Sequence, residues 1–295
     1  MKGLFANRWT VTALVVPGIA VVLFSLVVPI GFSGYYSFTD WAGFGKFHMI
    51  GLDNYREILT ADPVFWRSLL NALLLMIVTI CIQNPVAFIL AAVLAHLPER
   101  FSRLLRTVYF IPAVLSLVVV AKLWVNIFNP TYGILNKSLH LIGLSSVAIS
   151  WLSDPRTALW SVIWIVIWQG FGWALLFYYT GLMTVPREIE EATRVDGAGW
   201  WQAYTKVIIP FMFPVISAVI VIDVISCLKQ MEMIFLSTAG GPGQITQFVS
   251  VYLYQKAFVA SQYGYGNALS VLFVAVAVGI TLVVQRLLQR NDDVQ

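Results

Sequence analysis

The sequence predicts an all-α integral membrane protein with six transmembrane helices. Of its 295 residues, 59% are hydrophobic and only 11% are charged, whereas a soluble domain usually carries about a quarter charged residues. The apolar residues form long runs, and a run of about 20 is enough to cross a bilayer as a helix. Arginines and lysines gather in the short connections between runs, as they do in membrane proteins. The lipid bilayer is therefore the expected surrounding of most of the chain.

The predicted spans differ in regularity. The first contains Pro17, Pro29, Gly31 and Gly34, so we expect it to bend or to end early. It is too long for a cleaved signal peptide, and we expect it to be retained. Residues 1–66 would hold this span and an outer loop, and residues 67–290 a core of five spans that includes a cytoplasmic loop at 185–206. The six spans are predicted at 9–38, 68–95, 104–128, 157–184, 207–230 and 267–289.

The orientation follows from the basic residues of the connections. Arg100, Arg103 and Arg106 lie in the short connection between the second and third spans. Because basic residues are retained in the cytoplasm, this connection and both chain termini are predicted to be cytoplasmic. Three longer connections, at 39–67, 129–156 and 231–266, would then lie outside.

Several function classes find no support in the sequence. The net charge of +4 comes from residues in membrane connections, which argues against nucleic acid as a partner. Cys81 and Cys227 lie in apolar runs without nearby ligand residues, so neither a disulfide nor a zinc site is expected. No nucleotide-binding loop, catalytic motif or metal-ligand spacing is present. We therefore predict no catalytic residues, no metal site and no cofactor in this chain. The histidines are scattered, at His48, His96 and His140.

The connection between the fourth and fifth spans has the pattern of a helix–turn–helix. Pro186 suits the first position of a helix, and the acidic residues that follow it favour the positive helix start. Gly197 then permits a sharp turn. Such a surface feature is costly to leave exposed, so it is predicted to bind a partner protein. Its outward polar residues are predicted to be Glu188, Glu191 and Arg194, and its apolar ones are Ile189, Val195 and Trp200.

The same connection resembles a known family. Permease subunits of type I ATP-binding-cassette importers carry Glu-Ala-Ala, three residues, Gly, nine residues, Ile, one residue and Leu-Pro. Here Glu191-Ala192-Thr193, Gly197, Val207 and Ile209-Pro210 keep that spacing throughout. The departures, at Thr193, Val207 and Ile209, are small or isosteric. An isolated Glu and Gly would more often be ordinary loop residues, but the complete spaced pattern favours the functional interpretation.

Other segments resemble the carbohydrate-uptake branch of this family, the maltose-type permeases. These segments are Gly51 to Tyr55, Phe65 to Asn71, and Gly240 to Gly243. The resemblance covers nearly the whole chain. It points to the first of two unlike permeases in a system that carries a carbohydrate or a related polar solute, such as a polyol or a sugar phosphate.

The resemblance implies the rest of the machine. A second permease would complete the pathway, two ATPase subunits would bind ATP and magnesium in the cytoplasm, and an extracytoplasmic solute-binding protein would deliver the solute. The chain itself would be no enzyme, and it would lie in a bacterial-type cytoplasmic membrane. The residues expected to couple it to the ATPase are Glu188, Glu191, Ala192, Arg194, Asp196, Gly197 and Pro210.

Polar and aromatic residues within the spans are candidates for the substrate pathway. Trp168 and Gln169 lie deep in the fourth span, where a tryptophan either packs in an aromatic stripe with Trp160 and Trp164 or stacks on a sugar. Asp223 lies mid-span, where an ionisable residue is either functional or bonded to a neighbouring helix. Gln83 and Asn84 either bind substrate or satisfy backbone groups that Pro85 leaves free.

Two other functions remain possible at this level. A stand-alone transporter driven by an ion gradient would also place polar residues within its spans, but it would not need the spaced cytoplasmic loop. A membrane-embedded enzyme would need catalytic motifs, which the sequence lacks.

Overall fold

The computed structural model describes residues 8–292, with the side chains of residues 8–11, 187, 190, 194 and 290–292 left out of the description. Within this part the chain is helical, and its only β pairing is an isolated bridge between Thr39 and Met49. The chain divides into two compact units. The first unit comprises Met1–Asp62 and Leu253–Val276, and the second comprises Pro63–Tyr252 and Ala277–Gln295.

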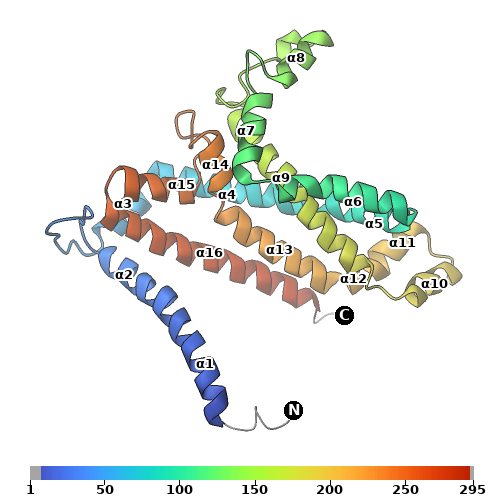
Figure 1. Ribbon diagram of the computed structural model, residues 1–295, viewed down its shortest axis with the longest axis horizontal. Coiled ribbons are helices and arrows are strands. Elements are labelled where there is room, and N and C mark those ends of the chain that lie inside the picture. Colours follow the sequence, from blue (N-terminus) through green and yellow to red (C-terminus); the bar gives the residue numbers. More distant parts are fainter. Residues whose placement is uncertain (1–7, 293–295) are drawn as a thin grey trace. The chain divides into compact units, whose positions relative to one another are not determined.

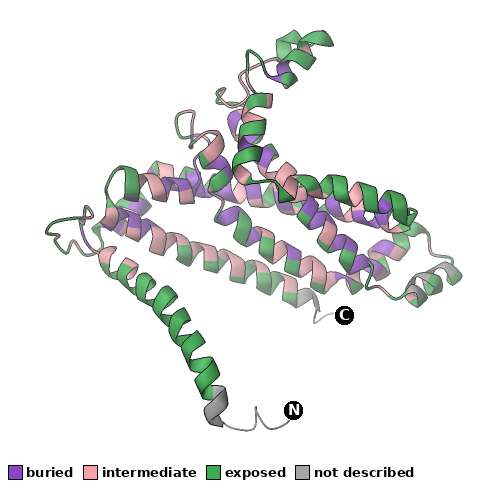
Figure 2. Cartoon of the chain, in the orientation of Figure 1, coloured by how far each residue is buried: buried purple, intermediate pink, exposed green. Residues whose placement is uncertain are grey.

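The first unit begins with one continuous apolar helix that covers Thr12–Tyr36. The expected early end at the prolines and glycines is wrong, because the helix runs through Pro17 and Pro29. Its described side chains are almost all exposed up to Phe32, as Figure 2 shows. The segments of this unit are α1 Arg8–Val22, the π turn η1 Leu23–Val27, α2 Val28–Tyr36, α3 Asp53–Thr60, η5 Gln255–Val259 and the start of α16 Tyr263–Asp292.

The second unit holds most of the predicted core, whereas the last span, α16, begins in the first unit (Figure 1). Its first span is an unbroken helix from Pro63 to His96, made of α4 Pro63–Val78, the π turn η2 Thr79–Gln83 and α5 Asn84–His96. The helices that follow are α6 Glu99–Val114, α7 Leu117–Ile127, α8 Ile134–Leu141, the 3-10 turn η3 Ser145–Val147 and α9 Ala158–Leu182. After them come α10 Arg187–Val195, α11 Trp200–Ala203, η4 Tyr204–Ile208, α12 Ile209–Phe211, α13 Phe213–Leu228, α14 Glu232–Ser237 and α15 Val249–Tyr254.

Two predicted spans are broken rather than continuous. Residues 104–128 form α6 and α7, which meet at an angle of 97°, because Leu115 and Ser116 are extended. Residues 207–230 are divided at Met212, where the helices meet at 71°. Pro214 lies just beyond that break, and a proline disfavours continuous helix before it. Four helices of the described chain can each cross a membrane, and counting each bent pair as one span gives the predicted six.

Three of the π turns share a position relative to proline. Each ends two residues before one: η1 before Pro29, η2 before Pro85 and η4 before Pro210. Proline lacks an N–H and crowds the carbonyl four residues earlier. The wider π turn accommodates this mismatch within the hydrogen-bond ladder. The helices therefore continue through prolines that would otherwise be expected to break them.

The core of the second unit lies where α9 packs against α5 and α6. Gly172 of α9 allows the close approach to α6, because a Cβ at this position would overlap the Tyr109 carbonyl. Farther along α9, Leu175 and Tyr178 are almost fully buried against the alanines of α5. Other buried residues of the second unit lie on α4, α13, α14 and α15 (Figure 2). This packing fixes α9, the helix that leads directly into the predicted docking connection.

Candidate functional site

Residues 185–206, here called the docking segment, form the expected helix–turn–helix. Helix α10 ends at Val195, and α11 begins at Trp200. Gly197 has a φ of +73°, the left-handed conformation that glycine adopts without strain. The turn is closed by the Ala198 N–H, which donates to the Thr193 carbonyl at 3.0 Å. The sequence pattern therefore forms the turn it was expected to form.

The surface of the docking segment is strongly exposed. Glu188, Glu191, Ala192 and Asp196 are all exposed. Val195 is 87% exposed, and the neighbouring Trp200 and Trp201 are exposed as well. The Arg194 side chain lies outside the described residues. Pro210 lies farther along, half-buried in α12.

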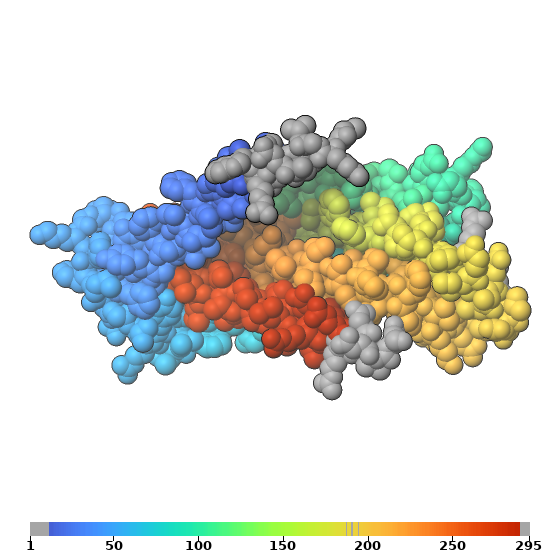
Figure 3. All heavy atoms as spheres, turned by 90° about the horizontal axis from the view of Figure 1, so that it is seen from below, coloured from blue at the N-terminus to red at the C-terminus, as the bar shows by residue number. Residues whose placement is uncertain are grey.

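The docking segment and the arginine-rich connection lie at the same end of the second unit. The Arg106 guanidinium lies over the Tyr179 ring, 4.0 Å from its centroid. The rings of His96 and Tyr204 lie 6.2 Å apart. In Figure 3 the docking segment, in yellow to orange, forms an end of this unit beside the green residues near 100. This arrangement agrees with a shared membrane side for the two connections.

A cavity of about 600 Å³, here called the pathway cavity, lies between the helices of the second unit. Three of the predicted pathway residues line it: Gln83 from η2, Gln169 from α9 and Asp223 from α13. These residues are far apart in the sequence, and the fold brings them together. The remaining lining residues are Thr79, Leu117, Val166, Gly170, Trp173, Ala174, Phe177, Val219, Ile222, Ser226, Cys227, Lys229, Gln230 and Glu232.

Asn84 does not line the pathway cavity but holds one of its residues. Its side-chain amide nitrogen donates to Asp223 Oδ2 at 3.0 Å. The amide therefore bonds a carboxylate on another span rather than the backbone freed by Pro85. Beside this pair, Cys227 Sγ donates to Thr79 Oγ1 at 3.5 Å and joins the same two spans.

Trp168 lies in a different environment. Its ring meets that of Trp124 nearly edge-on, with centroids 5.4 Å apart, and it packs on the cluster that contains Ile165 and Met233. The aromatic residues that line the pathway cavity are instead Trp173 and Phe177. Sequence reasoning followed the stripe at 160, 164 and 168 and missed them. The available signal was a second stripe, Gln169, Trp173 and Phe177, with the four-residue spacing of one helix face.

Charged residues near one end of the pathway cavity were also missed as lining residues. Lys229 and Glu232 both line it and are exposed. Across the described residues no ion pair joins them, although they lie only three positions apart. The signal in the sequence was a pair of charges placed where a span ends. In the same described part, no three His, Cys, Asp or Glu side chains are grouped so that they could hold a metal ion.

Comparison with known proteins places this arrangement in a family. Residues 83–293 match the model of the binding-protein-dependent transport system inner membrane component. The chain is 35% identical to a probable ABC transporter permease protein of Pyrococcus horikoshii, over 84% of this chain and 85% of that protein. It is 32% identical to the multiple sugar-binding transport system permease protein of Streptococcus mutans, over 97% of each.

A solved structure has the same fold. It is a bacterial ABC transporter involved in the import of the acidic polysaccharide alginate, and one of its chains superposes with a TM-score of 0.83 at 25% identity, covering 96% of both chains. The family match covers the docking segment, all of the pathway-cavity lining except Thr79, and the chain from the second half of the first core span onwards. The chain belongs to the binding-protein-dependent inner membrane components, the permease subunits of ABC importers.

Proposed function

We propose that this permease carries a carbohydrate or a related polar solute into the cytoplasm, driven by ATPase subunits that bind the docking segment. The observation that carries the proposal is the pathway cavity. It combines hydrogen-bonding side chains with aromatic rings between spans, and a sugar presents both a polar rim and an apolar ring face. Polar side chains at this depth are expensive unless they are paired or used. The names of the Streptococcus mutans relative and the alginate transporter also support a carbohydrate.

Five of the lining residues have a role in this proposal. Gln83, Gln169 and Asp223 would hydrogen-bond the hydroxyl groups of the solute, and Trp173 and Phe177 would offer the aromatic surface. All five line one cavity. Asn84 would hold Asp223 in place, as their hydrogen bond suggests. Trp168 does not line the cavity, and it would stabilise the helices of the pathway by packing on Trp124.

The docking segment would receive a cytoplasmic ATPase. Glu188, Glu191 and Arg194 would supply polar contacts, with Ala192 and Asp196 beside them. Gly197 would form the turn, and Pro210 would mark the start of the fifth span that follows the docking segment. The exposure of Glu191 and Val195 supports this role, because a partner would cover the apolar side chain. Two ATPase subunits would bind ATP and magnesium, a second permease would complete the pathway, and a solute-binding protein would act from outside.

A stand-alone transporter driven by an ion gradient is not favoured. The family of this chain depends on a binding protein, and the exposed docking segment has no role in a carrier that works alone. Purification of the tagged chain from its own membrane distinguishes the two functions. We expect an ATPase subunit and a second permease to copurify. Recovery of the chain alone, with uptake that persists after ATP depletion, would favour the ion-driven carrier.

The solute is identified by reconstitution. The purified complex is placed in proteoliposomes with its solute-binding protein and tested with radiolabelled glucose, maltose, raffinose, glycerol and glycerol 3-phosphate. We expect ATP-dependent uptake of a sugar from this panel. ATP-dependent uptake of glycerol or glycerol 3-phosphate alone would identify a related polar solute instead, and would leave the importer function intact.

The proposed orientation has its own test. Reporter fusions after residue 100 and after residue 195 should both give a cytoplasmic signal, because the arginine-rich connection and the docking segment share one end of the unit. A fusion at residue 145, in a connection predicted to lie outside, serves as the opposite control. An extracytoplasmic signal from either of the first two fusions would overturn the orientation.

A further inference from the structure

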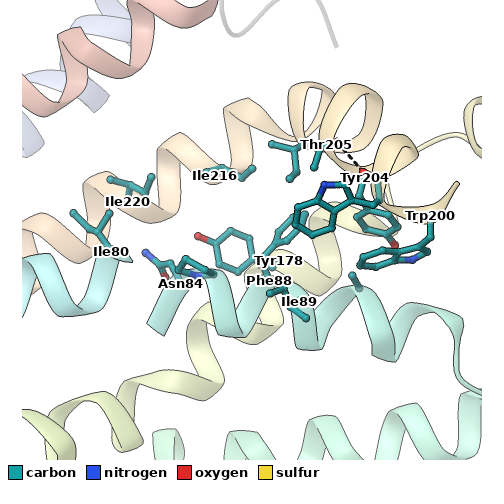
Figure 4. A pocket seen from close by; sticks show the side chains of 14 residues that line it. Ile80, Asn84, Phe88, Ile89, Tyr178, Trp200, Tyr204, Thr205, Ile216 and Ile220 are labelled. Atoms are coloured by element: carbon teal, nitrogen blue, oxygen red, sulfur yellow. Dashed lines mark hydrogen bonds between the residues drawn. The ribbon is translucent and has the colours of Figure 1, made fainter. Parts of the chain in front are cut away.

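A second cavity, of about 340 Å³ and here called the apolar cavity, lies in the second unit (Figure 4). It lies between α5, α9, α13 and the α11–η4 part of the docking segment. Apolar side chains such as Ile89, Ile216 and Ile220 dominate its lining. Trp200 and Tyr204 lie at one end, and Asn84 lies at the other. The cavity therefore extends from the docking segment to the residue that holds Asp223.

A series of aromatic ring contacts also runs from the docking segment towards Asn84. Trp200 stacks on Tyr204, with centroids 4.4 Å apart. The Tyr204 ring meets that of Phe88 at 6.4 Å, and Phe88 meets Tyr178 at 5.6 Å, both nearly edge-on. Each ring contacts the next, so a shift of Trp200 can be transmitted along the series from ring to ring. A displacement of the docking segment would therefore reach Tyr178.

The far end of this series is an incompletely satisfied polar group. The Asn84 side chain is 4% exposed, and its Nδ2 is bonded to Asp223. Its Oδ1 is buried and accepts no hydrogen bond from the described residues. Figure 4 shows the Tyr178 hydroxyl directed towards Asn84, although no hydrogen bond between them is recorded. A buried acceptor without a partner favours any movement that supplies one.

We propose that Tyr178 and Asn84 are positioning residues that link the docking segment to Asp223. A docked ATPase that presses the segment inward would narrow the apolar cavity and move Tyr178 until its hydroxyl donates to Asn84 Oδ1. Asn84 then holds Asp223 in a second position within the pathway cavity. The two arrangements differ by one hydrogen bond and by the volume of one cavity, which gives a docking partner a basis for favouring one of them. This inference rests on the proposed function, because it requires both the ATPase and the solute pathway.

The test uses the complete transporter in proteoliposomes with ATP, its binding protein and the sugar of the panel that the wild-type complex transports. The quantity measured is the number of sugar molecules imported per ATP hydrolysed. Tyr178→Phe removes only the hydroxyl. We expect this ratio to fall by about 2- to 13-fold, the range for one hydrogen bond, while the ATPase rate and the amount of assembled complex stay unchanged. Tyr179→Phe is the matched control, because the Tyr179 ring lies under Arg106; it should match the wild type.

A double variant tests whether the two residues act together. Asn84→Ala should lower the ratio, and adding Tyr178→Phe should lower it no further, because the hydroxyl then has no acceptor. If Asn84→Ala fails to assemble, Asn84→Leu keeps the side-chain volume and replaces it in the cycle. Independent, multiplicative losses would overturn the proposal, and so would a normal ratio in Tyr178→Phe. A wild-type complex without any ATP-dependent uptake would instead overturn the proposed function, and this inference with it.

Discussion

Residues 238–248, here called the closed connection, and the docking segment both lie in the second unit, and both turn at glycines with positive φ. Gly240 has a φ of +92° and Gly197 a φ of +73°. A Cβ at Gly240 would overlap the Gln247 side chain, whereas a Cβ at Gly197 would meet nothing within 4 Å. The same residue type thus serves a crowded turn in one connection and an open turn in the other.

The closed connection satisfies its own polar groups. Thr246 donates to the Gly241 carbonyl at 2.6 Å, and its hydroxyl lies 2.7 Å from that of Thr238. The Asn71 amide donates to the carbonyls of Ile245 and Gln247, both at 2.8 Å. The docking segment instead exposes apolar and charged side chains. One connection is hydrogen-bonded within this chain, and the other leaves its side chains exposed.

Substitution of valine at the two glycines is expected to give the largest difference, which is a difference in the amount of protein found in the membrane. Gly240→Val would place a branched side chain against Gln247 in a left-handed conformation. Strain and overpacking together should cost about 2–5 kcal/mol of folding free energy, enough to remove most of the protein from the membrane. Gly197→Val has only the conformational strain, about 1–2 kcal/mol, and should remain at near wild-type levels. Quantitative blotting of membrane fractions checks this, and equal loss of both variants would remove the distinction between the two connections.

Charge reversal in the docking segment should abolish function without abolishing folding. We expect Glu191→Lys to reach the membrane at the normal level and to lose ATP-dependent uptake, because an exposed charge at a contact acts mainly on binding. Gly197→Val should lose uptake as well, since the turn would be distorted. Glu57→Lys, an equally exposed reversal in the first unit, serves as the control for ATPase association. Normal copurification of the ATPase with both docking variants would show that the partner binds elsewhere.

The two hydrogen bonds from the Asn71 amide to the closed connection, here called the Asn71 clamp, should contribute measurably to stability. Asn71→Ala removes two hydrogen bonds from a buried site and leaves two carbonyls poorly satisfied, so the free energy of unfolding should fall by about 2–4 kcal/mol. Ser68→Ala on the same helix is the matched control. Its buried hydroxyl has no recorded partner in the described part, so its removal should be nearly neutral. Denaturant unfolding in detergent measures both, and equal midpoints would contradict the clamp.

The smallest effect is expected in the pathway between the two connections. Gln169→Ala should lower uptake by about 2- to 13-fold, the loss of one hydrogen bond when the partner can rehydrate, with assembly intact. Trp173→Ala should weaken uptake by a similar route, whereas Trp168→Ala should act mainly on stability, because it removes packing against Trp124. Uptake and thermal stability measured on the same preparations separate the two tryptophans. A purely structural effect of Trp173→Ala would argue against its place on the solute surface.

Sequence reasoning succeeded where a local pattern determines the structure. Apolar length predicted the helices, and the proline, acidic and glycine positions of residues 185–206 predicted the docking segment. The bend at Leu115 and Ser116 was not predictable, because hydropathy records how apolar a run is but not the direction of its backbone. The contact between Asn84 and Asp223 spans 139 positions. Only tertiary packing sets such a pair.

The choice between Trp168 and Trp173 shows a second limit. Both are tryptophans of one apolar helix, and neighbouring positions differ by about 100° around its axis. Which of two stripes faces a cavity depends on how α9 is rotated, and α5, α6 and α7 set that rotation by packing. Gln169 carried the needed information, because a polar residue deep in a span usually faces the protein interior.

The π turn η2 inserts an extra residue into its span. A π turn contains one more residue than the same stretch of α-helix. The span from Pro63 to His96 therefore has one extra residue between α4 and α5. A regular helix without that extra residue would have α5 rotated by about 100° and shifted by about 1.5 Å relative to α4. The π turn begins at Thr79 and ends at Gln83, and both residues line the pathway cavity. The extra residue therefore sets which side chains of α5 face α13, among them the Asn84 that bonds Asp223.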